Sequence, residues 1–182
     1  MNADLERHIL DALLGKPLVG NAFRGTLLEA MLAQVLEPEW RWCSADWASY
    51  DFENADGVGL EIKQSAALQS WHTPGAKTNQ GRFDIAERTG RYEGLEWIAE
   101  PGRAAAIYVF AWHPVIDHDA ADHREPEQWQ FFPVKASDLP RQKTIALSRI
   151  AKLSEPASIE QIAAAVRSLA NQPPDHDATP DC

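Results

Sequence analysis

The feature that most constrains the fold is a nearly continuous apolar run in the second half of the chain. Between Arg103 and Trp112 the sequence reads Ala-Ala-Ala-Ile-Tyr-Val-Phe-Ala. A run of this kind is typical of a strand that is buried on both faces of a sheet. Residues 128–134 predict another strand, and Pro133 places that strand nearer to an edge because proline cannot donate a ladder hydrogen bond.

A hairpin is predicted earlier in the chain, where two segments of alternating pattern, 47–54 and 58–65, flank Ala55-Asp56-Gly57. Such a three-residue loop places Gly57 in the left-handed region. In that register Asp51 lies directly opposite Glu61. A two-residue loop would pair Phe52 with Glu61 instead and would separate the two carboxylates.

Helical patterns precede and follow these strands. The spacing predicts a short helix over 4–14, ended by Gly15, and a stronger helix over 22–36, with Asn21 as its N-cap and Pro38 as its stop. The stronger helix has an apolar stripe made of Leu28, Met31, Leu32 and Val35. Residues 147–153 indicate a short helix, and the capping box Ser158-Ile159-Glu160-Gln161 opens a last helix to about Ala170.

The order of these elements predicts an α/β fold with one central mixed sheet flanked by helices. The length of 182 residues fits a single domain, which we expect over residues 1–170. Residues 171–182 hold three prolines and no periodicity, so we expect an acidic, disordered tail there.

Composition and charge exclude several classes of protein. No stretch approaches the roughly 20 apolar residues of a membrane helix, and the acidic N-terminus does not read as a secretory signal. Cys43 and Cys182 form neither a disulfide framework nor a zinc-ligand set, so a reducing, cytoplasmic setting is expected. The net charge of −10 opposes nucleic-acid binding, but segment 117–127 and the tail supply seven of those charges. A locally basic surface between Lys63 and Arg91 remains open.

Chemistry is indicated by four residues: Glu29, Asp51, Glu61 and Lys63. In the predicted hairpin Asp51 and Glu61 share one face, and Lys63 lies on the face of Glu61. Two carboxylates and a backbone carbonyl, here that of Ile62, are ligands that Mg²⁺ prefers. This group suits metal-assisted phosphodiester hydrolysis, in which Lys63 orients or deprotonates the attacking water and Glu29 completes the shell.

Three alternatives compete with this interpretation. Glu29 lies at the edge of its helical stripe, where a solvated carboxylate is the commoner outcome. The Glu-x-Lys triplet can arise by accident on a hairpin surface, in which case the four residues do not converge. Asp56 in the turn is a substitute metal ligand if Asp51 faces the wrong way.

The arrangement resembles the PD-(D/E)XK superfamily of restriction-endonuclease-like nucleases. The resemblance rests on Gly25-Thr26-Leu27-Leu28-Glu29, Tyr50-Asp51-Phe52, Leu60-Glu61-Ile62-Lys63-Gln64-Ser65, Arg82-Phe83-Asp84-Ile85 and Ile107-Tyr108-Val109-Phe110. It implies an αβββαβ core, DNA as substrate, and Mg²⁺ as cofactor with Mn²⁺ as its substitute. It leaves a homodimer open. Tyr50 departs from the motif's nominal proline.

The resemblance also assigns roles. Asp51 and Glu61 are implied as metal ligands, Lys63 as the catalytic lysine and Glu29 as an accessory carboxylate. Gln64 matches a glutamine that contacts the metal-site water or DNA. Because some members have lost catalysis, a noncatalytic module that binds nucleic acid or protein is the alternative function.

Two further segments have ambiguous patterns. The loop at 69–82 carries polar and aromatic groups that could contact bases or phosphates, or it is an ordinary surface loop with Trp71 packed in the core. His113, His118 and His123 lie among aspartates between two predicted strands. Their spacing does not match a helical zinc site, so we expect a solvated loop.

Overall fold

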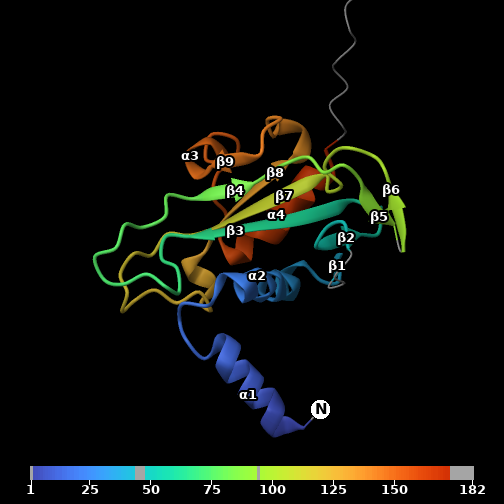
Figure 1. Cartoon of the computed structure of the whole chain (residues 1–182). Helices are drawn as coiled ribbons and strands as arrows, with labels where there is room; N and C mark the ends of the chain where they lie inside the picture. The colour runs from blue at the N-terminus through green and yellow to red at the C-terminus, as the bar shows by residue number, and fades with distance from the viewer. Residues whose placement is uncertain (1, 44–47, 94, 173–182) are drawn as a thin grey trace, which may run out of the picture.

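The computed structural model describes residues 2–43, 48–93 and 95–172, and it has a mixed α/β fold (Figure 1). Trp47, the first residue of the predicted hairpin, and the predicted tail from 173 onward lie outside the described residues. The helices are α1 (Ala3–Leu14), α2 (Asn21–Leu36), α3 (Leu147–Ile150) and α4 (Ile159–Ala170), and two 3-10 turns are Pro126–Gln128 and Ala136–Asp138. The strands are β1 (Trp40–Trp42), β2 (Phe52–Asn54), β3 (Gly59–Ala66), β4 (Arg82–Asp84), β5 (Arg91–Glu93), β6 (Glu96–Ile98), β7 (Ile107–His113), β8 (Gln130–Lys135) and β9 (Thr144–Ala146).

The central sheet has the strand order β1-β2-β3-β7-β8. β3 and β7 are parallel, whereas the other neighbours are antiparallel, so the predicted mixed sheet is confirmed. Every residue of β7 is buried, as its apolar sequence predicts. β8 lies at the edge, as Pro133 indicates.

The hairpin between β2 and β3 has the predicted register. Phe52 pairs with Leu60 and Glu53 with Gly59, and Gly57 turns the chain at a φ of 76°. The first strand is shorter than predicted because the chain bends over residues 49–51. Beyond Phe52 the pairing shifts by one residue. The Asp51 N–H donates at 3.0 Å to the carbonyl of Leu60, which is also the partner of Phe52, so the predicted pairing of Asp51 with Glu61 is wrong.

The two faces of the sheet are covered differently. Helices α2 and α4 pack together on one face, where their apolar side chains surround Ile62, Val109 and Phe131. The other face is covered by the β4–β9 ribbon and α3, which pack on Phe110 and Phe132. The expectation of flanking helices is therefore correct for one face, whereas strands and one short helix cover the other.

The connection from β3 to the parallel strand β7 departs from the αβββαβ order. A helix is expected there, but the described residues of this connection form the short strands β4, β5 and β6 and no helix. That expectation is wrong for the part of the connection that the structure describes. The hairpin β5–β6 stands at one end of the sheet, and the loop between β3 and β4 extends from the other end (Figure 1).

The predicted helices are otherwise confirmed, with one correction at the start of α2. Gly20 rather than Asn21 is its N-cap, because the Asn21 side chain accepts hydrogen bonds from Arg24 and Gln64. The capping box of Ser158 and Gln161 opens α4 as predicted. None of the helices in the described ranges is both long and apolar enough to cross a membrane.

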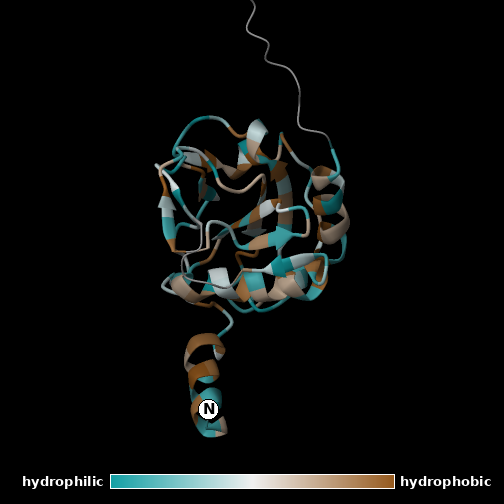
Figure 2. Cartoon of the chain, turned by 90° about the vertical axis from the view of Figure 1, so that its right-hand side faces the viewer, coloured by the Kyte–Doolittle hydropathy of each residue, from teal (hydrophilic) through white to brown (hydrophobic). Residues whose placement is uncertain are grey.

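Helix α1 projects away from the rest of the chain (Figure 1). It has no buried residue, and its apolar residues, which colour parts of its ribbon brown in Figure 2, include the exposed Leu5, Ile9 and Leu10. Packing therefore contributes little to this helix. Its ends are held by local hydrogen bonds, with Asn2 as the N-cap and Gly15, the predicted stop, as the C-cap.

Candidate active site

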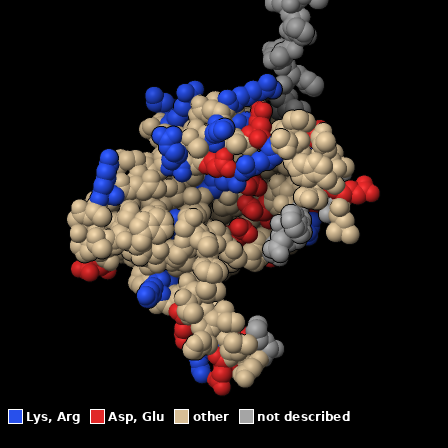
Figure 3. All heavy atoms as spheres, in the orientation of Figure 1, with Lys and Arg blue, Asp and Glu red and all other residues tan. Residues whose placement is uncertain are grey.

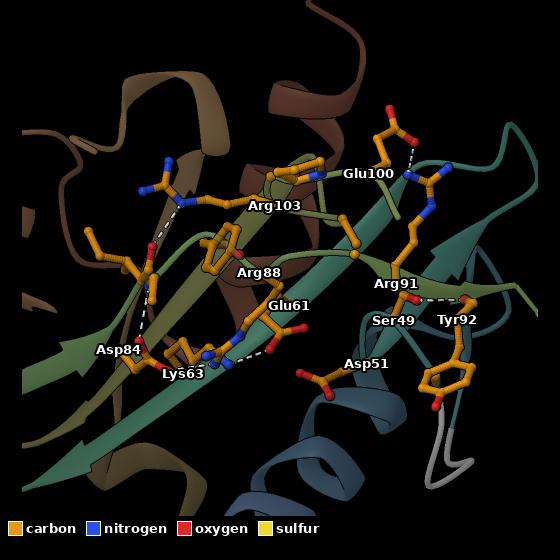
Figure 4. Close-up of a pocket in the computed structure, with 18 of the residues that line it drawn as sticks. Ser49, Asp51, Glu61, Lys63, Asp84, Arg88, Arg91, Tyr92, Glu100 and Arg103 are labelled. Carbon is orange, nitrogen blue, oxygen red and sulfur yellow. Dashed lines mark hydrogen bonds and ion pairs between the residues drawn. The ribbon is translucent and has the colours of Figure 1, made fainter. Parts of the chain in front are cut away.

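A cavity of about 350 Å³ lies beside the first half of β3 and holds three of the predicted site residues. Asp51, Glu61 and Lys63 all line it, and Figure 4 shows Glu61 pointing from β3 toward Asp51. The hairpin places Asp51 next to β3, where it lines the same cavity as Glu61, and alternation along β3 places Lys63 on the same face as Glu61. Three of the four residues whose convergence would oppose an accident of alternation thus line one cavity, whereas the fourth, Glu29, does not.

Asp51 occupies the point where β2 separates from β3. The Ile62 N–H donates to Asp51 Oδ2 at 2.6 Å, in place of a ladder bond to another strand. Burial, and then the nearby charge of Glu61, raise the pKa of Asp51 to about 7 against the lowering effect of that hydrogen bond. A half-buried carboxylate that repels a second carboxylate is a candidate for binding a cation or a proton.

Glu61 and Lys63 form an ion pair within the cavity. Lys63 Nζ donates to Glu61 Oε1, and the two side chains are 25% and 19% exposed, respectively. Tyr108 pairs with Glu61 across β3 and β7 and also lines the cavity. Burial raises the pKa of Tyr108 to about 12, so its phenol stays protonated and adds no charge near Glu61.

Sequence reasoning missed the opposite wall of the cavity. This wall is built by the β3–β7 connection, and its charged members are Asp84, Arg88, Arg91, Glu100 and Arg103. Arg88 Nη2 pairs with Asp84 Oδ2 at 2.6 Å, and Arg91 pairs with Glu100 (Figure 4). A hydrogen bond from Ala86 N–H, and then the pairing with Arg88, lower the pKa of Asp84. In the sequence, this wall was indicated by the basic residues between Lys63 and Arg91 and by the segment Arg82-Phe83-Asp84-Ile85.

The charges of this cavity balance. Its described lining contains four acidic and four basic side chains. In Figure 3, Asp and Glu side chains gather in the middle of the corresponding face, and Lys and Arg side chains lie above them. A basic surface therefore accompanies the carboxylates despite the net charge of −10.

Two aromatic residues stand beside this wall on the hairpin β5–β6. The rings of Tyr92 and Trp97 lie 5.1 Å apart, and Trp97 is 50% exposed. Ser49 Oγ donates to the Tyr92 carbonyl at 2.8 Å, so the hairpin is tied to the segment that carries Asp51. The cavity thus combines carboxylates, cations and an exposed aromatic surface.

Glu29 does not line the cavity. Its Oε2 accepts a hydrogen bond from Trp42 Nε1 at 3.0 Å, so its carboxylate is engaged on the α2 side of the sheet. The charge of Glu29 still contributes to the raised pKa of Asp51, after burial and Glu61. Glu29 is thus close to the site without being placed to complete it. Asp56 is exposed in the turn and also lies outside the cavity.

Gln64 faces a different part of the molecule from Lys63. Its Oε1 accepts from Arg24 Nε at 2.6 Å, and its Nε2 donates to Asn21 Oδ1 at 3.2 Å. It lines a second cavity rather than the one with Asp51. Alternation along β3 explains the difference, because adjacent strand residues point to opposite faces.

The donor set around Asp51 suits a hard cation. The N–H and C=O groups of one strand residue leave on the same side, so the Ile62 carbonyl faces Asp51 as its N–H does. One or two carboxylates with water and substrate oxygens are the usual set for Mg²⁺. The structure shows no group of three or more His, Cys, Asp or Glu side chains that could hold a metal ion among the described residues. Asp51, Glu61 and the carbonyl fit the cation; Glu29 does not join them.

The histidine segment differs from its expectation. His113 and His123 are fully buried, with ring centroids 4.8 Å apart, and both contact Trp129. Burial lowers both pKa values, that of His123 to about 4. The solvated-loop interpretation is wrong for these two residues, because the segment 117–129 folds back over β7. Trp71 is 65% exposed, so its packing in the core is also wrong.

No protein-family model matches the chain, and no curated protein matches it.

Proposed function

We propose that the chain is a divalent-metal-dependent nuclease that hydrolyses phosphodiester bonds, with DNA as its substrate. The observation that supports it is the convergence of Asp51, Glu61 and Lys63 in one charged cavity. Two carboxylates and a lysine on adjacent strands supply cation ligands and a proton-bearing group at one place. Neither a surface hairpin nor a structural ion pair requires the buried, repelled carboxylate of Asp51.

Each residue has a distinct role in this proposal. Asp51, Glu61 and the Ile62 carbonyl would hold Mg²⁺, or Mn²⁺ in its place. When bound, the ion would polarise a phosphoryl oxygen and lower the pKa of a bound water. Lys63 Nζ orients the attacking water and offsets the negative charge that develops on the phosphate. Glu29 adds negative potential from the α2 side.

The opposite wall would position the substrate. Arg88 and Arg91 place guanidinium groups on the cavity wall, where they can contact phosphate oxygens. Tyr92 and Trp97 offer ring faces on which bases can stack. These contacts compensate locally for the acidic charge of the whole chain.

The proposal includes a restriction-endonuclease-like core. The succession α2, β1, β2, β3 and the parallel strand β7 supports it, since β3 carries Glu61 and Lys63 at the centre of the sheet. The described part of the connection between β3 and β7 contains no helix, which is a departure from that core. The β4–β9 ribbon covers the face that this helix would occupy.

A cleavage assay tests the proposal. Supercoiled plasmid and single-stranded DNA are incubated with wild-type protein and Mg²⁺ or Mn²⁺, with Lys63→Ala and Arg167→Ala as variants. Arg167 pairs with the exposed Glu39 and serves as the charge-matched control. We expect cutting by the wild type and the control, none by Lys63→Ala, and none with EDTA. Equal cutting by Lys63→Ala would contradict the proposed site.

One observation favours the alternative of a noncatalytic binding module. Lys63 is paired directly with Glu61, so each neutralises the other in the unliganded chain. A binding module would keep this pair intact, bind DNA or protein without metal, and cut no DNA form. The assay therefore separates the two functions.

A further inference from the structure

A second cavity, of about 440 Å³, lies at the opposite end of β3 from Asp51. It is formed where the start of α2, the end of β3 and the loop leading to β4 meet. Its described lining contains three cationic side chains, those of Arg24, Lys77 and Arg82, and it contains no acidic side chain. In contrast to the balanced first cavity, this one offers positive charge alone.

Arg24 is the most unusual residue of this cavity, because it is only 1% exposed and has no carboxylate partner. Its Nε donates to Gln64, and its Nη2 donates to Asn21 and Gln69, all of which are neutral amides. Its Nη1 is buried and has no hydrogen-bond partner in the described part of the chain. Burying a guanidinium without a counter-charge is costly, and an anion in the cavity would offset that cost.

The groups packed around Arg24 do not supply the missing negative charge. His113 and His123 are close enough for Arg24 to lower their pKa values, after the larger effect of burial. Both rings are therefore neutral at neutral pH. Burial likewise lowers the pKa of Arg24 itself, to about 10, which still leaves its guanidinium protonated.

The start of α2 adds to the positive potential. Its N-cap is Gly20, which has no side chain to accept from the free N–H groups, and its first turn contains no acidic residue. The partial positive charge of a helix N-terminus favours an anion. At the edge of the same cavity, Trp71 is 65% exposed and offers a ring face.

We propose that this second cavity binds a phosphate group of the nucleic-acid strand that is cut at the first cavity, with a neighbouring base stacked on Trp71. That the phosphate belongs to the cleaved strand rests on the proposed function, whereas the preference of this cavity for an anion does not. Glu61 and Ser65, which line the two cavities, are separated by four steps of β3, about 13 Å. That distance equals the rise of about four nucleotides in a duplex strand. One strand can therefore reach both cavities.

Binding without cleavage tests this proposal. Anisotropy of a labelled single-stranded oligonucleotide is measured in EDTA over a series of salt concentrations, for the wild type and for Lys77→Ala combined with Arg82→Ala. Both side chains are exposed, so the double variant should fold. We expect an affinity about tenfold lower and a salt slope smaller by about 1.4, the value for two lost phosphate contacts on a single strand.

Two further variants make the result specific. Trp71→Ala should weaken binding by fivefold or more while leaving the salt slope unchanged, because stacking releases no counterions. Arg167→Ala removes one positive charge beyond the other end of the 16-residue helix α2, where Arg167 pairs with Glu39, and should change neither quantity. Unchanged affinity and slope in the double variant would overturn the proposal.

Inorganic phosphate distinguishes a strand from a free anion as the ligand. If the cavity serves a strand, the oligonucleotide should bind at least a hundredfold more tightly than phosphate, which should act only as a weak competitor. Equal affinities for the oligonucleotide and for phosphate would overturn the proposal that the cavity binds a nucleic-acid strand and would indicate a pocket for a free anion. If the protein binds DNA through this cavity but cuts no DNA, the proposed nuclease function is contradicted and the phosphate site is not. If the protein cuts DNA and its binding does not depend on this cavity, the phosphate site is contradicted and the nuclease function is not.

Discussion

The cavities at the two ends of β3 differ in the charges of their lining side chains. At one end, Asp51 and Glu61 face each other in a cavity whose cations and acids balance. At the other end, Arg24 is buried among neutral amides in a cavity whose described lining has no acid. Within the described residues, Asp51 at the first end has no ion-pair partner, and Arg24 at the second end has no carboxylate partner. The difference indicates that the first end suits a cation and the second an anion, which are the two components of a metal-dependent reaction on a phosphodiester.

The largest expected effect separates Lys63 from its neighbour Gln64. Lys63→Ala should lower the single-turnover rate of DNA cleavage by about 10³-fold, since Lys63 faces the carboxylates. Gln64→Ala should lower the rate by less than about tenfold, because its side chain faces Arg24 in the second cavity. Equal losses in the two variants would show that the ends of β3 do not act separately.

The pH dependence of stability probes the carboxylate end. Because the pKa of Asp51 is raised from 3.8 to about 7, the folded chain retains a proton that the unfolded chain releases. The free energy of unfolding therefore falls as pH rises through this window. Asp51→Asn should be more stable than the wild type by about 2–4 kcal/mol near pH 8 and by about nothing near pH 4.

Urea unfolding at the two pH values measures this difference. Asp56→Asn removes an acidic side chain from the exposed turn of the same hairpin and is the matched control. A variant of Asp51 that is no more stable than the wild type near pH 8 would mean that the carboxylate is not buried at a cost. The cation end would then lose its main electrostatic argument.

Ions of opposite sign should stabilise the two ends separately. At about ten times its dissociation constant, phosphate should raise the free energy of unfolding by about 1.4 kcal/mol. The double change of Lys77→Ala and Arg82→Ala should abolish this gain but not the stabilisation by Mn²⁺. Thermal unfolding with each ion gives both values. Loss of both effects together would contradict independent sites.

The smallest expected effect concerns the turn that sets the register of the hairpin. Gly57 has a φ of 76°, and a Cβ there would meet no atom within 4 Å, so Gly57→Ala strains only the backbone. We expect a loss of about 1 kcal/mol. Gly25→Ala in α2 should instead stabilise by up to about 1 kcal/mol, because helical glycine is unfavourable. Denaturant midpoints of the two variants should therefore move in opposite directions.

The sequence predicted the parts of the site that depend on local pattern. The turn at Gly57 set the register, and the alternation on β3 then placed Glu61 and Lys63 on the face of Asp51. The same alternation puts Gln64 on the opposite face, where it contacts Arg24. The role that the family resemblance implies for Gln64, beside the metal site, was therefore at odds with strand alternation.

The remaining parts depend on long-range packing. The β4–β9 ribbon joins segments far apart in the chain, and the wall with Arg88 and Arg91 has no helical or strand periodicity long enough to detect. His113 and His123 are buried by a segment that returns over β7, which no local pattern indicates. The cationic cavity likewise arises only when α2, β3 and the following loop meet.

Calorimetric titration of Mn²⁺ near pH 8 tests the central claim, that Asp51 and Glu61 form a cation site. The wild type should bind Mn²⁺, and Asp51→Asn and Glu61→Gln should each bind at least tenfold more weakly. Glu29→Gln should bind almost as well as the wild type, since Glu29 is held by Trp42 outside the cavity. Mn²⁺ binding that is equal in the wild type and in Asp51→Asn would contradict the account.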